Sequence, residues 1–257
     1  MRLDIFLKEN GFVSSRTKAQ ELINGNNLLL DDVICVDVKK EIGETFDKSR
    51  IKITENEEMN YVSRSYKKLK VGLECFDIKV EDKVCLDIGS STGGFTQVLL
   101  ENNVKKVFSV DVGTDQFDKN LLEKYKDRIR LFEKTDIRNF GKEEGDLENI
   151  YKNFFDIVVC DISFISITKI AENIFELLKE GGVGVILIKP QFEVGKGNIG
   201  KGGLVKSEKL SYEELINITT SNIKIEFEKN NLKVINVVDS PILGGDGNKE
   251  FLMHIQK

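Results

Sequence analysis

The chain has 257 residues, enough for one large domain or for a small module followed by a larger domain. Hydrophobic residues make up 40% of it and charged residues 32%, a composition that excludes a disordered, collagen-like or disulfide-stapled protein. The 38 basic and 43 acidic side chains leave a net charge of −5, which by itself argues against a nucleic-acid-binding protein, although binding surfaces depend on local charge.

The cysteines and the chain ends predict a cytoplasmic protein. No CxxC spacing is present, and the cysteines lie mostly in apolar runs, which predicts buried free thiols in a reducing compartment. They are Cys35, Cys75, Cys85 and Cys160. Asp4 and Glu9 interrupt the region where a signal peptide needs an apolar core. The apolar stretches are far shorter than the roughly 18 residues of a transmembrane helix.

The first 55 residues predict a small α+β module. Apolar residues recur with helical spacing over residues 3–7 and 19–23, with Ser14 as a candidate N-cap and Gly25 as a candidate C-cap of the second helix. Short β-type runs follow at 28–30, 33–36 and 51–53. The polar stretch 55–58 then resembles the start of a linker.

From residue 84 onward, apolar strands alternate with helical segments. The strand candidates are 84–88, 107–110, 129–132, 157–160, 183–188 and 234–238. Such strands, buried on both faces, are typical of a doubly wound parallel α/β sheet. The last run, 251–255, follows a turn-rich segment too closely for a crossover helix, so we expect an antiparallel last strand.

A glycine-rich turn follows the first of these strands. Gly89, Gly93 and Gly94 allow backbone to approach a ligand at the carboxyl end of the strand. Their GxxxGG spacing differs from the GxGxxG of dinucleotide sites, which disfavours an NAD-dependent oxidoreductase. Asp111 ends the next strand, where a carboxylate can accept both hydroxyls of a ribose. A nucleoside without a pyrophosphate fits this pattern better than NAD, and a plain strand-to-helix turn is the structural alternative.

Charged residues stand at the ends of three later strands. Asp161 and Lys189 follow strands of the predicted parallel sheet and therefore fall at the ligand-binding edge. A lysine that ends an apolar strand is unusual, and a snorkelling surface side chain is the alternative. Glu250 opens the last strand, and taken alone it is best explained as a solvated strand end.

Two basic segments offset the acidic total. The first, 61–70, contains Arg64 and Lys67 and no acid; the second is the glycine-rich loop 195–203, with Lys196 and Lys201. Such segments can hold phosphates by charge and backbone N–H groups, or can be solvated loops. His254 is the single histidine and the cysteines are not clustered, so we expect no metal site.

Taken together, these motifs resemble the TlyA family of ribosomal RNA 2′-O-methyltransferases, in which an S4 RNA-binding domain precedes an FtsJ-like (RrmJ-like) domain. The resemblance covers essentially the whole chain. Its motifs are Tyr61–Arg64 with Lys68 and Leu69, 87–96, 111–113, 136–138, 161–166, 189–193, and 240–252. One departure is Ser65-Tyr66, where the family usually has two glycines.

The resemblance implies a Rossmann-like methyltransferase fold and S-adenosylmethionine as cofactor, with ribosomal RNA or a ribosomal subunit as partner and cytidine as the modified nucleotide. It implies an S4-like domain over 1–58, a linker over 59–64 and an FtsJ-like domain over 65–257. The implied catalytic residues are Lys68, Asp161, Lys189 and Glu250. The cofactor candidates are Gly89, Ser90, Ser91, Gly93, Gly94, Phe95, Asp111 and Asp136. The RNA-binding candidates are Arg16, Lys18, Arg64, Lys67, Lys196 and Lys201.

These residue types suit methyl transfer to a ribose hydroxyl. The hydroxyl must be aligned with a sulfonium methyl and must lose its proton, and Lys189 is our candidate base, oriented by Asp161. Lys68 and Glu250 would hold the ribose. A nucleotide inside folded RNA has to be extruded, with Phe192 or Tyr66 as a candidate stacking partner.

Two further hypotheses remain beside the enzyme. One is a non-catalytic RNA-binding or ribosome-assembly factor that keeps a methyltransferase fold. The other follows from the family's older label, haemolysin, and would require a membrane-active segment. The sequence contains no stretch amphipathic and basic enough, or long and apolar enough, to enter a bilayer.

Overall fold

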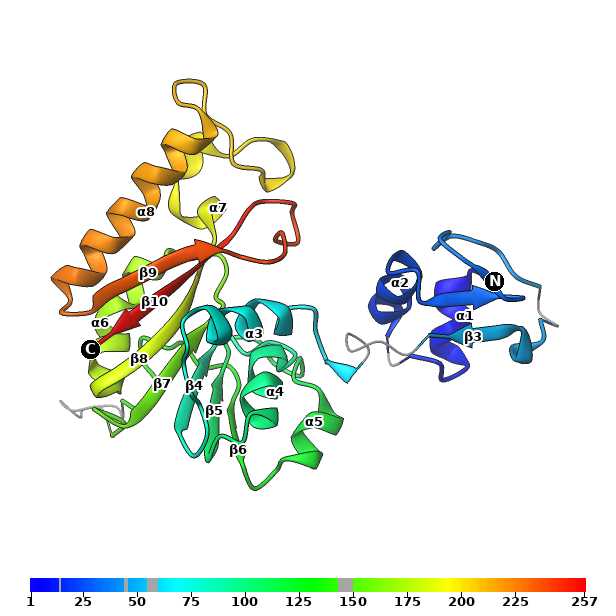
Figure 1. Ribbon diagram of the computed structural model, residues 1–257, viewed down its shortest axis with the longest axis horizontal. Helices are drawn as coiled ribbons and strands as arrows, with labels where there is room; N and C mark the ends of the chain where they lie inside the picture. The colour runs from blue at the N-terminus through cyan, green and yellow to red at the C-terminus, as the bar shows by residue number, and fades with distance from the viewer. Residues whose placement is uncertain (14, 44–45, 55–59, 143–149) are drawn as a thin grey trace. The chain divides into compact units, whose positions relative to one another are not determined.

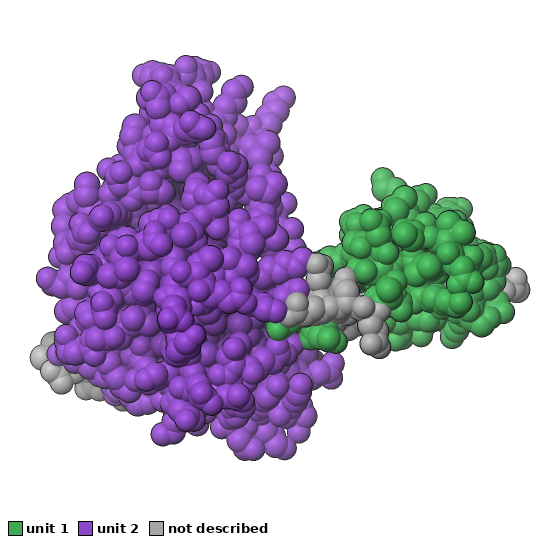
Figure 2. Space-filling view, in the orientation of Figure 1, with its two compact units in different colours: residues 1–61 green, residues 62–257 purple. Residues whose placement is uncertain are grey.

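The computed structural model describes residues 1–13, 15–43, 46–54, 60–142 and 150–257. They form two compact units, Met1–Tyr61 and Val62–Lys257, which are coloured separately in Figure 2. Each unit has its own hydrophobic core and is described by itself. The domain limits 1–58, 59–64 and 65–257 stay a prediction, and the polar stretch 55–58 lies outside the described residues.

The first unit has the predicted helix-helix-strand order. Its elements are α1 (Leu3–Glu9), α2 (Arg16–Asn24), β1 (Leu28–Leu30), β2 (Val33–Ile34), a 3-10 turn (Lys48–Arg50) and β3 (Ile51–Ile53). The strands pair antiparallel in the order β2-β1-β3. The second strand is shorter than predicted and ends at Ile34; Val33, Ile34 and Val36 are exposed and Cys35 is buried.

The second helix of this unit is capped at both ends. Ser15 is its N-cap, and the Ser15 side chain accepts a hydrogen bond from the Lys18 N–H. Gly25 is the C-cap, as predicted. The predicted N-cap was the preceding residue, Ser14, which lies outside the described residues; the prediction is corrected to Ser15, whose side chain makes the capping hydrogen bond.

The second unit is an α/β fold with helices on both faces of one sheet (Figure 1). Its strands are β4 (Val84–Ile88), β5 (Lys106–Val110), β6 (Ile129–Phe132), β7 (Phe155–Cys160), β8 (Leu178–Ile188), β9 (Lys233–Asp239) and β10 (Phe251–Gln256). Its helices are α3 (Tyr66–Cys75), α4 (Gly94–Glu101), α5 (Lys119–Lys124), α6 (Ala171–Leu177), α7 (Pro190–Glu193) and α8 (Tyr212–Lys229). Short 3-10 turns are η3 (Ile167–Ile170), η4 (Lys196–Asn198) and η5 (Lys201–Gly203).

Within the described part of this unit the strands form one seven-stranded sheet in the order β6-β5-β4-β7-β8-β10-β9. The strands from β6 to β8 pair parallel, whereas β10 pairs antiparallel with both β8 and β9, which confirms the predicted antiparallel last strand. The chain order reverses between β4 and β7. In open α/β sheets, ligands bind outside the carboxyl ends of the strands at such a switch point.

Neighbouring residues of β8 show how the two faces are covered. Ile186 and Ile188 lie in the core cluster with Ile174 of α6 and Phe227 of α8. Val185, which directly precedes Ile186, lies against Gly72 of α3, whose missing side chain allows this approach: a Cβ there would lie 3.0 Å from Val185. Because adjacent strand residues point to opposite faces, the continuous apolar run is buried on both sides.

Three of the cysteines are buried as predicted, but Cys75, the last residue of α3, is exposed. All four are free thiols. Within the residues that the structure describes, no helix combines the length and the apolar character needed to cross a bilayer.

Asp4 organises the start of the first unit. Its side chain is fully buried and accepts hydrogen bonds from Arg2, Arg16 and Gln20. Burial opposes ionisation of this carboxyl, but the hydrogen bonds outweigh it and lower the pKa of Asp4 to about 2. A depressed carboxyl pKa stabilises the fold above the unfolded-state value, and this stabilisation is lost as the pH falls from about 4 toward 2.

We expect Asp4→Asn to lower the stability of the first unit at pH 7 by about 1–3 kcal/mol, because hydrogen bonds to a charged acceptor are replaced by weaker ones. Native-state hydrogen exchange of α1 and α2 measures this loss, with β4 and β7 of the second unit as an internal control. The difference between variant and wild type should shrink between pH 4 and pH 2. A difference that is constant over this range would contradict the role of the charge.

Candidate active site

The glycine-rich turn after β4 packs directly on the end of β7. Gly89 has φ +82°, and a Cβ at this position would lie 2.6 Å from the backbone oxygen of Asp161. Gly93 also has a positive φ, +97°, and is the N-cap of α4. Both positions favour glycine because of their positive φ, and Gly89 also requires it because a side chain there would collide with the Asp161 backbone.

A cavity of about 180 Å³ opens above this turn, between the ends of β4 and β7. Of the predicted cofactor residues, Gly89, Ser90, Ser91 and Phe95 line it, and the predicted catalytic residues Asp161 and Lys189 are also part of its wall. Gly93 and Gly94 shape the turn without lining the cavity. Gly94 also makes room for the unusual serine at 65, because a Cβ on Gly94 would lie 2.2 Å from Ser65 Oγ.

Asp111 lies beside the turn, at the end of β5. Its carboxylate accepts hydrogen bonds from the backbone N–H of Ser91, at 2.8 Å, and of Gly113, at 2.7 Å. It thus connects the loop after β5 to the glycine-rich turn. Asp136, the remaining predicted cofactor residue, lies in the loop after β6 and pairs with Arg138, whose hydrogen bonds lower the pKa of Asp136. Neither carboxylate lines the cavity.

A buried acid, Asp87, lies within β4 beneath the turn. Burial raises its pKa to about 7, although the Thr96 hydroxyl donates to it at 2.6 Å. Asp87 is therefore only partly ionised near neutral pH. The Asp87 carboxyl thus lies buried below the turn, where burial disfavours its ionised form.

The four predicted catalytic side chains form one chain of charges at this edge of the sheet. Lys68 of α3 lies 2.6 Å from Glu250 and 3.7 Å from Asp161. Lys189 lies 2.6 Å from the other oxygen of Asp161, and its Nζ also donates to Ser163 Oγ at 2.8 Å. The two cations and two anions alternate, so each buried charge has an opposite charge beside it.

The burial of this set excludes the alternatives of a snorkelling lysine and a solvated strand end. The side chain of Lys189 is only 12% exposed and that of Glu250 only 2%. Charged side chains are rarely buried to this degree unless they are paired. The arrangement is a site in which an amine, Lys189 Nζ, is held at a cavity wall by two partners.

A second cavity of about 440 Å³ meets the first at Ser163 and Lys189, which line both. Phe164 and Phe192 form an aromatic wall in it, with ring centroids 5.5 Å apart. Phe164 is 88% exposed and adopts a left-handed conformation with φ +71°, unusual for a bulky residue. Phe192 was a predicted stacking residue, whereas Ser163 and Phe164 were not predicted individually, although both belong to the motif 161–166.

The other proposed stacking residue, Tyr66, does not have this accessibility. It is 3% exposed in the first turn of α3, so the suggestion that its ring stacks on a base is wrong for this structure. An aromatic residue beside a serine and two lysines carries no sequence signal that distinguishes a buried ring from an exposed one.

The predicted RNA-binding residues are spread over both units. In the first unit, Arg16 pairs with Asp4, and Lys18 Nζ donates to the Tyr61 carbonyl at 2.6 Å. In the second unit, Arg64 is exposed and donates to the Leu243 carbonyl.

The other three basic candidates line neither of the two cavities that meet at Lys189. Lys67 belongs to α3, and Lys196 and Lys201 are exposed in η4 and η5. Neither lysine of the glycine-rich loop lines the second cavity, but Ile199 and Gly203 of that loop do.

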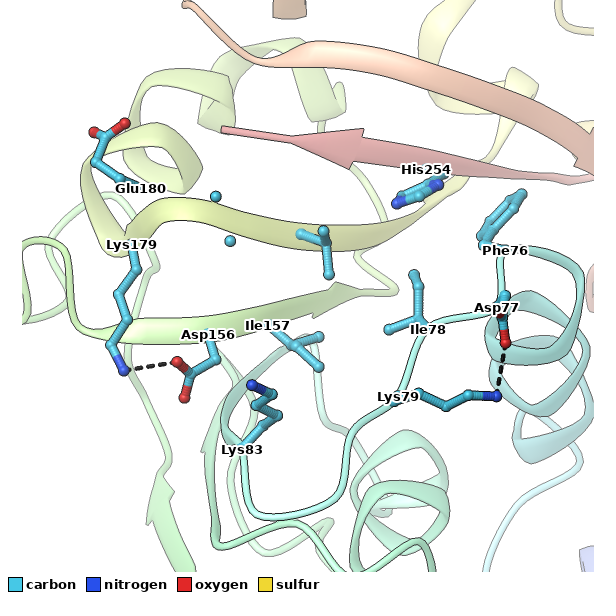
Figure 3. A pocket seen from close by; sticks show the side chains of 13 residues that line it. Phe76, Asp77, Ile78, Lys79, Lys83, Asp156, Ile157, Lys179, Glu180 and His254 are labelled. Carbon is cyan, nitrogen blue, oxygen red and sulfur yellow. Dashed lines mark hydrogen bonds and ion pairs between the residues drawn. The ribbon is translucent and has the colours of Figure 1, made fainter.

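A cavity of about 400 Å³ lies at the opposite edge of the sheet, where β4, β7 and β8 begin (Figure 3). His254 lies there within β10 as predicted, stacked on Phe76 with ring centroids 5.1 Å apart. Lys179 pairs with Asp156 at 2.7 Å in its wall. This cavity is separated from the four-residue set by the length of β8.

The parallel sheet, the glycine-rich turn and the buried charged set define an S-adenosylmethionine-dependent methyltransferase. The turn fits that cofactor: Ser90 Oγ is buried at the wall of the first cavity and has no hydrogen-bond partner within the described residues. A polar ligand atom would satisfy it.

Comparison with known proteins identifies the family. FtsJ-like methyltransferases match residues 61–257 and the S4 domain matches residues 1–44. The chain therefore belongs to the FtsJ-like methyltransferase family, in its TlyA branch with an S4 domain. "Hemolysin A" of Brachyspira hyodysenteriae is 37% identical over 99% of both chains. The "23S rRNA (cytidine-2′-O)-methyltransferase TlyA" of Campylobacter jejuni is 36% identical over 100% of both. A solved structure from Streptococcus thermophilus, 31% identical, has a TM-score of 0.72 and covers 100% of this chain and 88% of that one.

We expect Gly89→Ala to weaken S-adenosylmethionine binding by at least about tenfold, because the new methyl group collides with the Asp161 backbone as well as straining the turn. Gly181→Ala is the matched control, since Gly181 has a similar φ of +74° and open space around it. Titration calorimetry measures both variants. Equal affinities would show that the close approach of the two strand ends does not shape the cofactor cavity.

Proposed function

We propose that this protein methylates the ribose 2′-hydroxyl of a cytidine in ribosomal RNA, with S-adenosylmethionine as methyl donor. The observation that carries the proposal is the position of Lys189 Nζ, held by Asp161 and Ser163 where the two cavities meet. The printed names of the TlyA relatives support the nucleotide and the RNA.

Each member of the set has a distinct task in this proposal. S-adenosylmethionine, when bound, supplies an electrophilic methyl group. Lys189, acting as the neutral amine, accepts the proton of the 2′-hydroxyl as the new oxygen–carbon bond forms and the carbon–sulfur bond breaks. Asp161 and Ser163 orient the amine by accepting hydrogen bonds from it, which leaves the nitrogen lone pair free to accept the proton of the hydroxyl.

Lys68 and Glu250 hold the other side of the ribose. Glu250 lines the second cavity, and its carboxylate can accept from a sugar hydroxyl. Lys68 pairs with both Glu250 and Asp161, so each of these buried carboxylates has an opposite charge beside it. This assignment gives all four side chains a role: Lys189 is the base, Asp161 orients it, and Lys68 and Glu250 hold the ribose.

The second cavity suits the extruded base of the target nucleotide. An accessible aromatic surface, Phe164 beside Phe192, lies next to the amine that would act on the ribose. Base stacking on aromatic side chains is worth about 1–3 kcal/mol per base. Enzymes that act on nucleotides within folded nucleic acid commonly extrude the target in this way.

The first unit would anchor the substrate. An S4 domain and the names of the relatives point to RNA, although this unit with the start of α3, residues 1–70, has 13 basic and 12 acidic side chains. Binding would therefore depend on a local face and on RNA shape. Because ribosomes are its proposed substrate, we place the protein in the cytoplasm.

We expect Lys189→Ala to lower methyl transfer by at least about a hundredfold while binding of RNA and S-adenosylmethionine persists, since general bases contribute about 10²–10⁴. A tritium-transfer assay on ribosomal RNA measures turnover, and thermal melting shows whether the fold is kept. Lys233→Ala, an exposed lysine of β9, is the control. Retained turnover in the Lys189 variant would refute its role as the base.

We expect deletion of residues 1–58 to weaken binding of ribosomal RNA while S-adenosylmethionine binding by the remaining chain is unchanged. A filter-binding assay at fixed salt measures the RNA affinity, because such affinities depend strongly on ionic strength. An unchanged RNA affinity would refute the anchoring role.

A further inference from the structure

The Glu193 side chain accepts hydrogen bonds from a loop that lies far from it in the sequence. It is the last residue of α7, the single turn that follows Lys189 directly. One of its carboxylate oxygens accepts from Ser166 Oγ at 2.6 Å and the other from the backbone N–H of Ile167 at 2.9 Å. Both partners lie at the end of the loop that begins with Asp161.

The two loops joined in this way carry the reacting set. The loop after β7 supplies Asp161 and Ser163, and the loop after β8 supplies Lys189. Strand pairing holds the loops together only at their base, where Cys160 is in register with Ile186. Beyond that point residues 161–165 belong to no helix or strand, and Phe164 among them has the unfavourable φ of +71°.

From this geometry we propose that Glu193 is a positioning residue: it clamps the loop after β7 to the loop after β8 and so holds Asp161 and Ser163 against the Lys189 amine. The proposal rests on the function proposed above. Glu193 lines neither of the two cavities that meet at Lys189. It lines a separate cavity on the side of α8, with Ser166 and Leu215, so it acts through other residues and not on substrate.

The interaction is built to be strong. Burial raises the pKa of Glu193, and the hydrogen bonds from Ser166 and Ile167 oppose this rise. Hydrogen bonds to a carboxylate in such a partly desolvated place are stronger than those between neutral groups. Ser166 is at the same time the N-cap of η3, so the clamp also fixes where the loop ends and η3 begins.

The test compares Glu193→Ala with Glu193→Gln in the full chain, with Glu172→Ala, an exposed acid in the first turn of α6, as control. A glutamine can still accept from the Ile167 N–H and can donate to Ser166 Oγ, whereas alanine can do neither. We expect kcat for ribosomal RNA methylation to fall by about tenfold to a hundredfold in the alanine variant, since displacements near 1 Å can cost this much. The KM for S-adenosylmethionine should change by less than about threefold. The glutamine variant should recover most of the kcat that the alanine variant loses.

Hydrogen–deuterium exchange provides a second measurement that does not depend on the RNA substrate. In the alanine variant, exchange should become faster at Ile167 and across η3, 26 residues away from the substitution along the chain. The clamp is overturned if kcat of the alanine variant equals that of the Glu172 control, or if exchange of η3 is unchanged. If the wild-type enzyme does not methylate ribosomal RNA but η3 exchanges faster in the alanine variant, the proposed RNA substrate is refuted and the clamp is still supported.

Discussion

The structure of the active site depends on the alternation of two buried lysines and two buried carboxylates. Glu250, Lys68, Asp161 and Lys189 follow one another at distances of 2.6, 3.7 and 2.6 Å. Each of these charges would be costly to bury alone, and removing one partner from such a pair typically costs about 3–5 kcal/mol. The fold must therefore bring all four side chains together, because removing any one of them leaves at least one buried charge without one of its ion-pair partners.

This requirement gives the antiparallel last strand a physical meaning. Parallel strands present their carboxyl ends at one edge of a sheet, and Asp161 and Lys189 follow β7 and β8 at that edge. β10 runs the other way, so its amino end lies there, and Phe251 is in register with Ile188. Glu250, which directly precedes β10, thereby reaches Lys68. A parallel last strand would place the same glutamate at the opposite edge.

Net charge proved to be a poor guide to function because many of the acidic side chains are paired within the fold. The total of −5 suggested that nucleic acid was an improbable partner, yet an S4 domain occupies residues 1–44. Several acids are engaged locally: Asp4 gathers Arg2 and Arg16, Asp111 holds the glycine-rich turn, and Asp161 and Glu250 pair with lysines. Charge that is compensated inside the fold contributes little to the surface that a partner meets.

The sequence by itself determined most of the strands, the glycine-rich turn and the places of Asp161 and Lys189, because these depend on local periodicity, on backbone conformation and on position at strand ends. Lys68 and Glu250 were implied only by the resemblance to the family. Tertiary structure alone decided which side chains are accessible. It buried Tyr66 and Glu250, exposed Phe164 and Cys75, and joined Glu193 to Ser166. Burial and side-chain pairing depend on contacts between segments distant in the chain, and no spacing within a single segment encodes them.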